Sequence, residues 1–257
     1  MNGIPATMTA VHLVGHGGPD MLVVRHDVPV PVPSAGEVLI RVGACGMNNT
    51  DVNTRVGWYS KAVTGETTGE ALDVSDGDGS WGGSGIAFPR IQGADICGRV
   101  VAVGAGVGSG LIGRRVLNDP CIRDADDPGD RERAGYVGSE CDGGFAQYCV
   151  LPVRNVHAVE SPLTDVELAS FPCSWATAEH MLTRARVADG ETVVVTGASG
   201  GVGSALVQLA RARGARVVAI AGASKIDEVA GYGADAVVDR SAADLAGAVA
   251  EAAGGPI

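Results

Sequence analysis

The sequence lacks three features that would indicate a nucleic-acid-binding, membrane or exported protein. It has no run of Lys and Arg, and its formal net charge of −11 opposes binding to nucleic acid or to an anionic membrane. No stretch approaches the roughly 18 consecutive apolar residues of a membrane span. Residues Met1 to Thr7 lack the basic start and apolar core of a signal peptide. We therefore expect a cytoplasmic protein whose partner is a small molecule.

The sequence also lacks paired cysteine spacings. Its six cysteines are Cys45, Cys97, Cys121, Cys141, Cys149 and Cys173. Three of them lie in apolar, strand-like segments, which favours reduced thiols over disulfides. What the sequence does contain is 46% hydrophobic residues and 39 glycines, the composition of a globular, turn-rich chain with an ample core.

The chain reads as two domains, which we place at residues 8–158 and 159–257. In the first, short apolar segments alternate with Gly, Pro and Asp turns, as in an irregular β domain. Its predicted strands are Thr9–Val14, Val38–Ala44, Asp95–Val103, Arg115–Leu117 and Gly144–Leu151. Three prolines, at Pro29, Pro31 and Pro33, indicate an extended connection.

In the second domain, apolar strands alternate with amphipathic helices, which predicts an α/β fold with a parallel sheet. The predicted helices are 165–185, 201–213, 224–232 and 241–253, and the predicted strands are Thr192–Thr196, Arg216–Ala221 and Ala236–Asp239. Ser241 and Asp244 are spaced like a capping box at the start of the last helix. Because three strands make only the first half of a doubly wound sheet, we expect a fragment or truncated product.

A glycine-rich turn joins the first of these strands to the helix that begins near Gly201. Without a Cβ, the backbone can approach a pyrophosphate closely, and the start of the helix favours negative charge. The residues predicted to contact a dinucleotide are Gly197, Ala198, Ser199, Gly200, Gly201, Val202 and Gly203. A purely structural turn is the alternative, but the complete strand, helix and strand around it favour the nucleotide.

The end of the second strand indicates which dinucleotide binds. An NAD site normally presents Asp or Glu there, but this chain has Ala221 followed by Gly222. Ser224 and Lys225 could instead hold a 2′-phosphate, so we predict NADPH over NADH. For Lys225, an ordinary solvated position on the helix remains an equal alternative.

Three further segments, together with the glycine turn, resemble the medium-chain dehydrogenase/reductase superfamily. They are His12–Asp20, Pro33–Val42 and Gly93–Gly104. This superfamily includes the alcohol dehydrogenases and quinone oxidoreductases, and the resemblance covers nearly the whole chain. It implies a GroES-like irregular β-barrel domain followed by a partial Rossmann domain, and a homodimer in the full-length form.

The superfamily that the chain resembles has a zinc-dependent branch and a metal-free branch. In the zinc branch the first ligand is a cysteine three residues before an aspartate, whereas counting back from Asp51 gives Asn48. Cys45 lies three residues too early. The pattern Gly46–Asp51 is similar to that of the metal-free branch.

The other ligand positions agree with this interpretation. Ala94 occupies the place of the second-ligand histidine, with Asp95 beside it, and only Cys173 falls near the third position. The clustered cysteines of the family's structural zinc lobe are absent from the sequence. We therefore expect no catalytic zinc, although Cys45, Asp95 and Cys173 could still form an unusual metal site.

For the metal-free branch, the resemblance places residues 48–59 at the substrate pocket. We predict that Asn48, Asp51 and Tyr59 form the catalytic group, with the Asn48 amide and the Tyr59 hydroxyl as hydrogen-bond donors. Packing beside Trp58 is an equal alternative for Tyr59. Thr177 would face the nicotinamide, or it only packs in its helix.

Residues 60–89 depart from the family's pattern because the segment is long, acidic and rich in Gly and Ser. It is either a flap beside the pocket or an insertion without a role. The leading functional hypothesis is an NADPH-dependent, zinc-independent oxidoreductase that transfers hydride between nicotinamide and a small carbonyl, enone or quinone. The alternatives are an alcohol dehydrogenase with an altered zinc site and a truncated, non-catalytic NADPH-binding protein.

Overall fold

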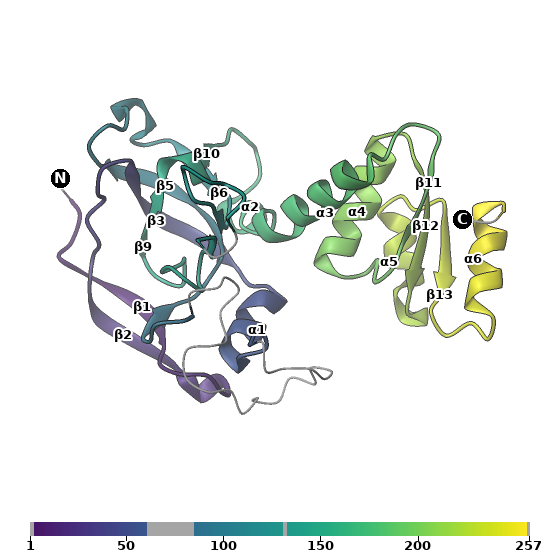
Figure 1. Cartoon of the computed structure of the whole chain (residues 1–257), viewed down its shortest axis with the longest axis horizontal. Helices are drawn as coiled ribbons and strands as arrows, with labels where there is room; N and C mark the ends of the chain where they lie inside the picture. Colours follow the sequence, from purple (N-terminus) through teal and green to yellow (C-terminus); the bar gives the residue numbers. More distant parts are fainter. Residues whose placement is uncertain (1–2, 61–84, 131–132, 256–257) are drawn as a thin grey trace. The chain divides into compact units, whose positions relative to one another are not determined.

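The computed structural model describes residues 3–60, 85–130 and 133–255. These residues form two compact units, Met1–Cys173 and Ser174–Ile257, whose elements are labelled in Figure 1. Most of residues 60–89, the segment predicted to be a flap or an insertion, lies outside the described residues. No helix among those that are described is long and apolar enough to cross a membrane.

The first unit is built from antiparallel β-structure. Its main sheet has the strand order β10-β6-β5-β3-β9, a second has the order β2-β1-β4, and β7 pairs with β8. The strands are β1 (Thr7–Leu13), β2 (Leu22–Pro29), β3 (Glu37–Gly46), β4 (Arg90–Ile91), β5 (Asp95–Val103), β6 (Arg115–Asn118), β7 (Cys121–Ile122), β8 (Gly135–Tyr136), β9 (Tyr148–Pro152) and β10 (Val156–Ala158). The helices are α1 (Asn49–Val56), α2 (Asp165–Leu168) and the short 3₁₀ turns η1 (Pro19–Met21), η2 (Ser109–Leu111) and η3 (Val153–Asn155).

The core of this unit lies on the main sheet, where alternate residues of neighbouring strands are buried. Val38 and Ile40 of β3 pack with Ile96 and Val100 of β5 and with Leu151 of β9. All five are 0% exposed. These buried residues belong to the short apolar segments from which the strands were predicted.

The sequence analysis did not predict β2, α1 or the short strands β4, β7, β8 and β10, and one predicted strand begins later than expected. Strand β2 is exposed or half-exposed along its length, so it carries no burial pattern that a sequence could reveal. Helix α1 is short and polar. Strand β9 begins at Tyr148 instead of Gly144 because the N–H groups of Gly144 and Phe145 donate to the carbonyls of Gly93 and Gln92 instead.

The second unit is a three-stranded parallel sheet with helices on both faces. The strand order is β11-β12-β13. Its elements are α3 (Pro172–Ala185), β11 (Thr192–Val195), α4 (Gly201–Ala212), β12 (Arg216–Ala221), the 3₁₀ turn η4 (Ala223–Lys225), α5 (Ile226–Gly231), β13 (Ala236–Asp239) and α6 (Leu245–Ala253). Both β12 and β13 have the predicted bounds.

Alternating residues of the central strand β12 pack on opposite faces of this sheet. Val217 and Ala219 join the core cluster that includes residues of α3, α4 and α5, whereas Val218 joins the cluster that includes α6. Figure 1 shows α4 and α6 on opposite sides of the sheet. The predicted α/β fold with a doubly wound parallel sheet is therefore confirmed.

The helix predicted at 165–185 is two helices, α2 and α3. Pro172 begins α3, and Pro disfavours the helical conformation at the residue before it, so one continuous helix cannot form. The N–H of Phe171 donates to the carbonyl of Leu168 in a tight turn between the two helices.

The capping box predicted for the last helix is also wrong. Helix α6 begins at Leu245, and its N-cap is Asp244, whose carboxylate accepts a hydrogen bond from the Gly247 N–H at 2.9 Å. Ser241 lies outside the helix, where its hydroxyl donates to Asp239 at 2.8 Å.

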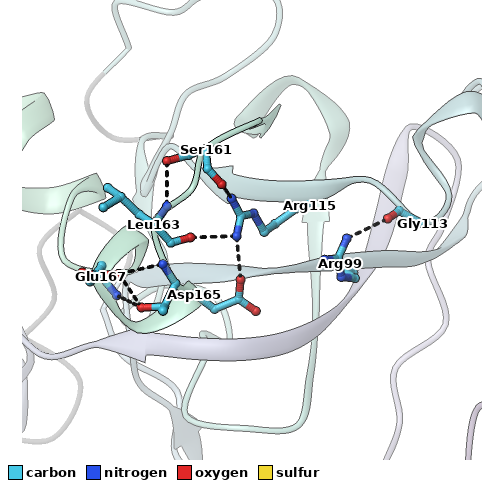
Figure 2. A network of polar contacts seen from close by, with 8 residues as sticks. Arg99, Gly113, Arg115, Ser161, Leu163, Asp165 and Glu167 are labelled. Carbon is cyan, nitrogen blue, oxygen red and sulfur yellow. Dashed lines mark hydrogen bonds and ion pairs between the residues drawn. The ribbon is translucent and has the colours of Figure 1, made fainter.

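The structural boundary between the two units follows Cys173, whereas the predicted domain boundary follows Ala158. The Arg115 guanidinium explains the difference (Figure 2). It donates to the carbonyls of Ser161 and Leu163 and lies 3.5 Å from the Asp165 carboxylate. These contacts hold the segment after Ala158 against β6, so the segment folds with the first unit.

Candidate functional site

The predicted catalytic residue Asn48 lies at the N-terminus of α1 and is bonded to the buried carboxylate of Asp95. Asn48 Nδ2 donates to Asp95 Oδ2 at 2.8 Å, and the N–H of Cys173 donates to Asp95 Oδ1 at 3.0 Å. Asp95 is 0% exposed, and burial raises its pKa to about 6 despite these two bonds. Asp95 therefore fixes the orientation of the Asn48 amide.

Asp51, the second predicted catalytic residue, binds backbone groups with both carboxylate oxygens. Oδ2 accepts from the Asn48 N–H at 2.8 Å and Oδ1 from the Gly93 N–H at 3.2 Å. Burial raises its pKa, and the backbone bonds oppose that effect. The carboxylate thus ties the start of α1 to the residues before β5, and a direct role in catalysis stays a prediction.

The third residue, Tyr59, lies just beyond α1. Its hydroxyl donates to Thr50 Oγ1 at 3.0 Å, and its ring makes an edge contact with Trp58, with a centroid separation of 5.1 Å. The structure thus contains the packing of Tyr59 beside Trp58 that the sequence analysis gave as an alternative to a catalytic role. Hydrogen bonding to a substrate stays a prediction.

Each of the three candidate metal ligands makes a hydrogen bond within the protein. The Cys45 thiol is directed to the Gly46 carbonyl, 3.6 Å away, and burial raises its pKa. Both Asp95 oxygens already accept hydrogen bonds. The Cys173 sulfur accepts one from the Tyr136 hydroxyl at 3.2 Å, and burial raises the pKa of its thiol.

A cysteine must lose its thiol proton to bind zinc, and burial of Cys45 and Cys173 opposes that loss. Within the part of the chain that the structure describes, no three Cys, His, Asp or Glu side chains form a group that could hold a metal ion. The sequence analysis did not select Tyr136, the partner of Cys173. The tyrosine lies in the short strand β8, 37 residues before Cys173, and only the folded chain brings the two side chains together.

In the second unit, the predicted pyrophosphate turn has the geometry that its glycines suggest. Gly197 has a left-handed φ of +60°, and a Cβ there would meet nothing within 4 Å. Gly200 is the N-cap of α4, so the first N–H groups of that helix have no acceptor within it. Gly203 serves packing, since its Cβ would lie 2.2 Å from the Gly197 oxygen. An open turn that ends in free N–H groups fits a dinucleotide phosphate.

The cofactor residues predicted outside the glycine turn are exposed, whereas Ala198 within the turn is buried. Thr177 lies on α3 beside the buried Ala178, and Ser224 lies in η4 after the second strand. The Lys225 ammonium lies 2.7 Å from Glu228 Oε2, in an ion pair whose partners are both about half-exposed. The charge of Lys225 is therefore partly compensated within the chain.

Comparison with known proteins assigns the chain to a family. The alcohol dehydrogenase GroES-like domain family matches residues 34–161. A solved structure from Sinorhizobium meliloti 1021, provisionally named an alcohol dehydrogenase, is 52% identical with a TM-score of 0.85, and the match covers 99% of this chain and 68% of that one.

Two curated relatives are less similar. Human quinone oxidoreductase is 31% identical over 216 residues, which cover 84% of this chain and 53% of the relative. Acryloyl-coenzyme A reductase from Metallosphaera sedula is 29% identical over 220 residues, which cover 82% of this chain and 59% of the relative. The chain spans little more than half the length of these curated relatives. With the β domain, the glycine turn and the parallel sheet, the similarities show that the chain belongs to the medium-chain dehydrogenase/reductase superfamily.

Proposed function

We propose that the protein is an NADPH-dependent reductase of quinones, enones or small carbonyl compounds that works without catalytic zinc. The observation that carries this proposal is the bond between Asn48 and Asp95. At the place where the zinc branch of the family has a thiolate, this chain has an amide. The neighbouring carboxylate holds that amide and has both its oxygens occupied.

The substrate class follows from chemistry that the names of two relatives share. Quinones and acryloyl thioesters are both carbonyl compounds conjugated to a carbon–carbon double bond, and these are the compounds in the names of the relatives. Such compounds accept a hydride at carbon and place the negative charge on the carbonyl oxygen. A reductase for this class needs hydrogen-bond donors for that oxygen and has no strict need of a metal.

The residues around α1 supply such donors. One Asn48 N–H is committed to Asp95, which orients the amide, and an amide nitrogen carries a second hydrogen. The Tyr59 hydroxyl can donate to a substrate oxygen in place of Thr50. A bound nicotinamide would supply the hydride, Asn48 and Tyr59 would stabilise the developing oxyanion, and Asp51 would hold Asn48 in place.

NADPH is favoured over NADH by the end of β12. Ala221 stands there without a carboxylate to bind a ribose 2′-hydroxyl, and Ser224 and Lys225 follow it. The glycine turn provides the pyrophosphate site of either dinucleotide, and Thr177 would lie against the nicotinamide. The preference for NADPH therefore depends on groups near Gly222.

Oxidation of NADPH, measured with a panel of quinones, enones and aldehydes, tests the proposal. We expect turnover with conjugated acceptors, and Asn48→Ala should lower kcat/KM by about tenfold or more, as loss of an oxyanion donor does. Asn53→Ala, on the same helix, is the matched control and should leave kcat/KM unchanged. Failure of every acceptor, or one zinc ion per chain in the active protein, would contradict the proposal.

A further inference from the structure

Arg240, a positively charged residue that is not among the predicted cofactor residues, lies beside the end of β12. Arg240 directly follows β13, and its N–H donates to the Ala221 carbonyl at 2.8 Å. In a βαβ dinucleotide unit, the end of the second strand is where the adenosine ribose binds. Because β13 pairs with β12, Arg240 lies at the expected ribose position although it is distant from Ala221 in the sequence.

The Arg240 side chain extends over Gly222. A Cβ built on Gly222 would lie 3.6 Å from Arg240 Nε and 3.8 Å from its Cζ, so the guanidinium borders the space that a side chain at position 222 would occupy. Gly222 has no side chain, so residue 222 does not cover the guanidinium of Arg240. The neighbouring acid, Asp239, already accepts hydrogen bonds from the N–H and the hydroxyl of Ser241, at 2.9 and 2.8 Å.

The charge of Arg240 is offset only weakly within the chain: the hydrogen bonds from Ser241 lower the pKa of Asp239 most, and the charge of Arg240 contributes least. Among the described residues, none forms a hydrogen bond or ion pair with its guanidinium, and the residue is exposed. Lys225, by contrast, is paired with Glu228, which also accepts a hydrogen bond from Tyr232 at 2.5 Å. A planar guanidinium binds phosphate through two parallel N–H groups, whereas an ammonium acts as a point charge.

We infer that Arg240 is the principal ligand of the cofactor's 2′-phosphate and that Lys225 and Ser224 contribute less. This inference rests on the proposed function, since it names the residue that sets the preference for NADPH. It changes the expected basis of specificity, from the residues just after β12 to the residue just after β13. Its physical basis is the unpaired charge of Arg240 and its position over Gly222.

Isothermal titration with 2′,5′-ADP and 5′-AMP tests the inference without any requirement for turnover. These probes differ only in the 2′-phosphate. The wild-type chain should bind 2′,5′-ADP at least about tenfold more tightly than 5′-AMP, the difference expected for a charged hydrogen-bonded group. Arg240→Ala should abolish most of this preference while changing the affinity for 5′-AMP by less than about twofold.

Three further variants complete the experiment. Arg240→Gln keeps a polar side chain that can donate hydrogen bonds but removes the charge. It should behave as Arg240→Ala does, and it replaces that variant if the alanine variant unfolds. Lys225→Ala should lower the preference by about threefold at most, because its charge is already paired. Arg184→Ala removes the same charge from an exposed position on α3 and should leave the preference unchanged.

The failures are distinguishable. If the wild-type chain binds both nucleotides equally, the NADPH part of the proposed function is wrong. If the wild-type chain prefers 2′,5′-ADP and both Arg240 variants retain that preference, only the assignment of Arg240 is wrong. A preference abolished by Lys225→Ala instead would identify the lysine as the principal ligand and overturn the inference.

Discussion

The polar groups of the two units are used in opposite ways. In the first unit, the side chains of the candidate site bind one another or the backbone: Asn48 binds Asp95, Tyr136 binds Cys173, and Asp51 binds two N–H groups. In the second unit, the glycine turn faces open space at Gly197, and Arg240 has no ion-pair partner among the described residues.

This difference indicates what each unit is prepared to bind. A network whose donors and acceptors already have partners is preorganised, and it can orient a neutral substrate through its remaining hydrogen bonds. By contrast, helix N–H groups without an acceptor and a guanidinium without an ion-pair partner can bind an anionic ligand. We therefore expect substitutions of groups that already have partners in the chain to change mainly its stability. Substitutions of groups without such partners should change mainly the binding of the ligand.

The largest structural effect in the second unit is expected for Gly203→Ala. Its Cβ would lie 2.2 Å from the Gly197 oxygen and 2.7 Å from the Ala198 Cα, both backbone atoms that cannot move aside cheaply. We expect a loss of about 3 kcal/mol in the free energy of unfolding, measured by urea denaturation. The matched variant is Gly200→Ala, whose Cβ would approach that oxygen only to 3.4 Å and should cost about 1 kcal/mol at most. Equal stability of the two variants would contradict the assignment of close backbone packing to Gly203.

The next effect is a pH dependence caused by Asp95. Its pKa is raised from the ordinary 3.8 to about 6 in the folded chain, so between these values the folded state binds more protons than the unfolded state. Stability should therefore fall as pH rises from 4 through 6, by about 2 kcal/mol from this residue. Asp95→Asn should remove that part of the slope when urea denaturation is repeated at several pH values. An unchanged slope would show that the Asp95 carboxyl titrates normally.

A comparable effect is expected where the first unit holds its C-terminal segment. Arg115→Met removes the hydrogen bonds to Ser161 and Leu163 and the ion pair to Asp165, and should destabilise the chain by about 2 kcal/mol in thermal unfolding. Arg99→Met is the control, because that arginine makes a single exposed bond to Gly113 and should cost about 0.5 kcal/mol. If the two variants lose the same stability, the contacts in Figure 2 do not anchor this segment.

The smallest structural effect is expected for Tyr59→Phe. This change removes only the bond from the Tyr59 hydroxyl to Thr50 and leaves the ring against Trp58, so the unfolding free energy should fall by about 1 kcal/mol or less. If the hydroxyl also stabilises a substrate oxyanion, kcat should fall further than this structural loss explains. A kcat equal to that of the wild type would reduce Tyr59 to a packing residue.

The sequence predicted strands that consist of short, largely buried apolar segments. Strands β5, β12 and β13 have the predicted bounds because their apolar residues face packed helices or sheets. Strand β2 was missed because it is an exposed edge strand, and the break before Pro172 was missed because the apolar pattern continues across it.

Contacts between distant residues could not be predicted in this way. Nothing near Asp95 in the sequence shows that its oxygens bind Asn48 and the N–H of Cys173. Arg240 likewise reaches Gly222 only because β13 pairs in register with β12. The residues that directly follow β12 in the sequence include Lys225 but not Arg240, which lies next to the end of β12 only in the folded chain.

Titration of the unmodified chain with NADPH and NADH is the most direct test of the central claim that the second unit is built for a 2′-phosphorylated dinucleotide. Isothermal calorimetry at low ionic strength gives both dissociation constants on one preparation. The account predicts that NADPH binds at least about tenfold more tightly than NADH. Equal affinities, or tighter binding of NADH, would contradict it.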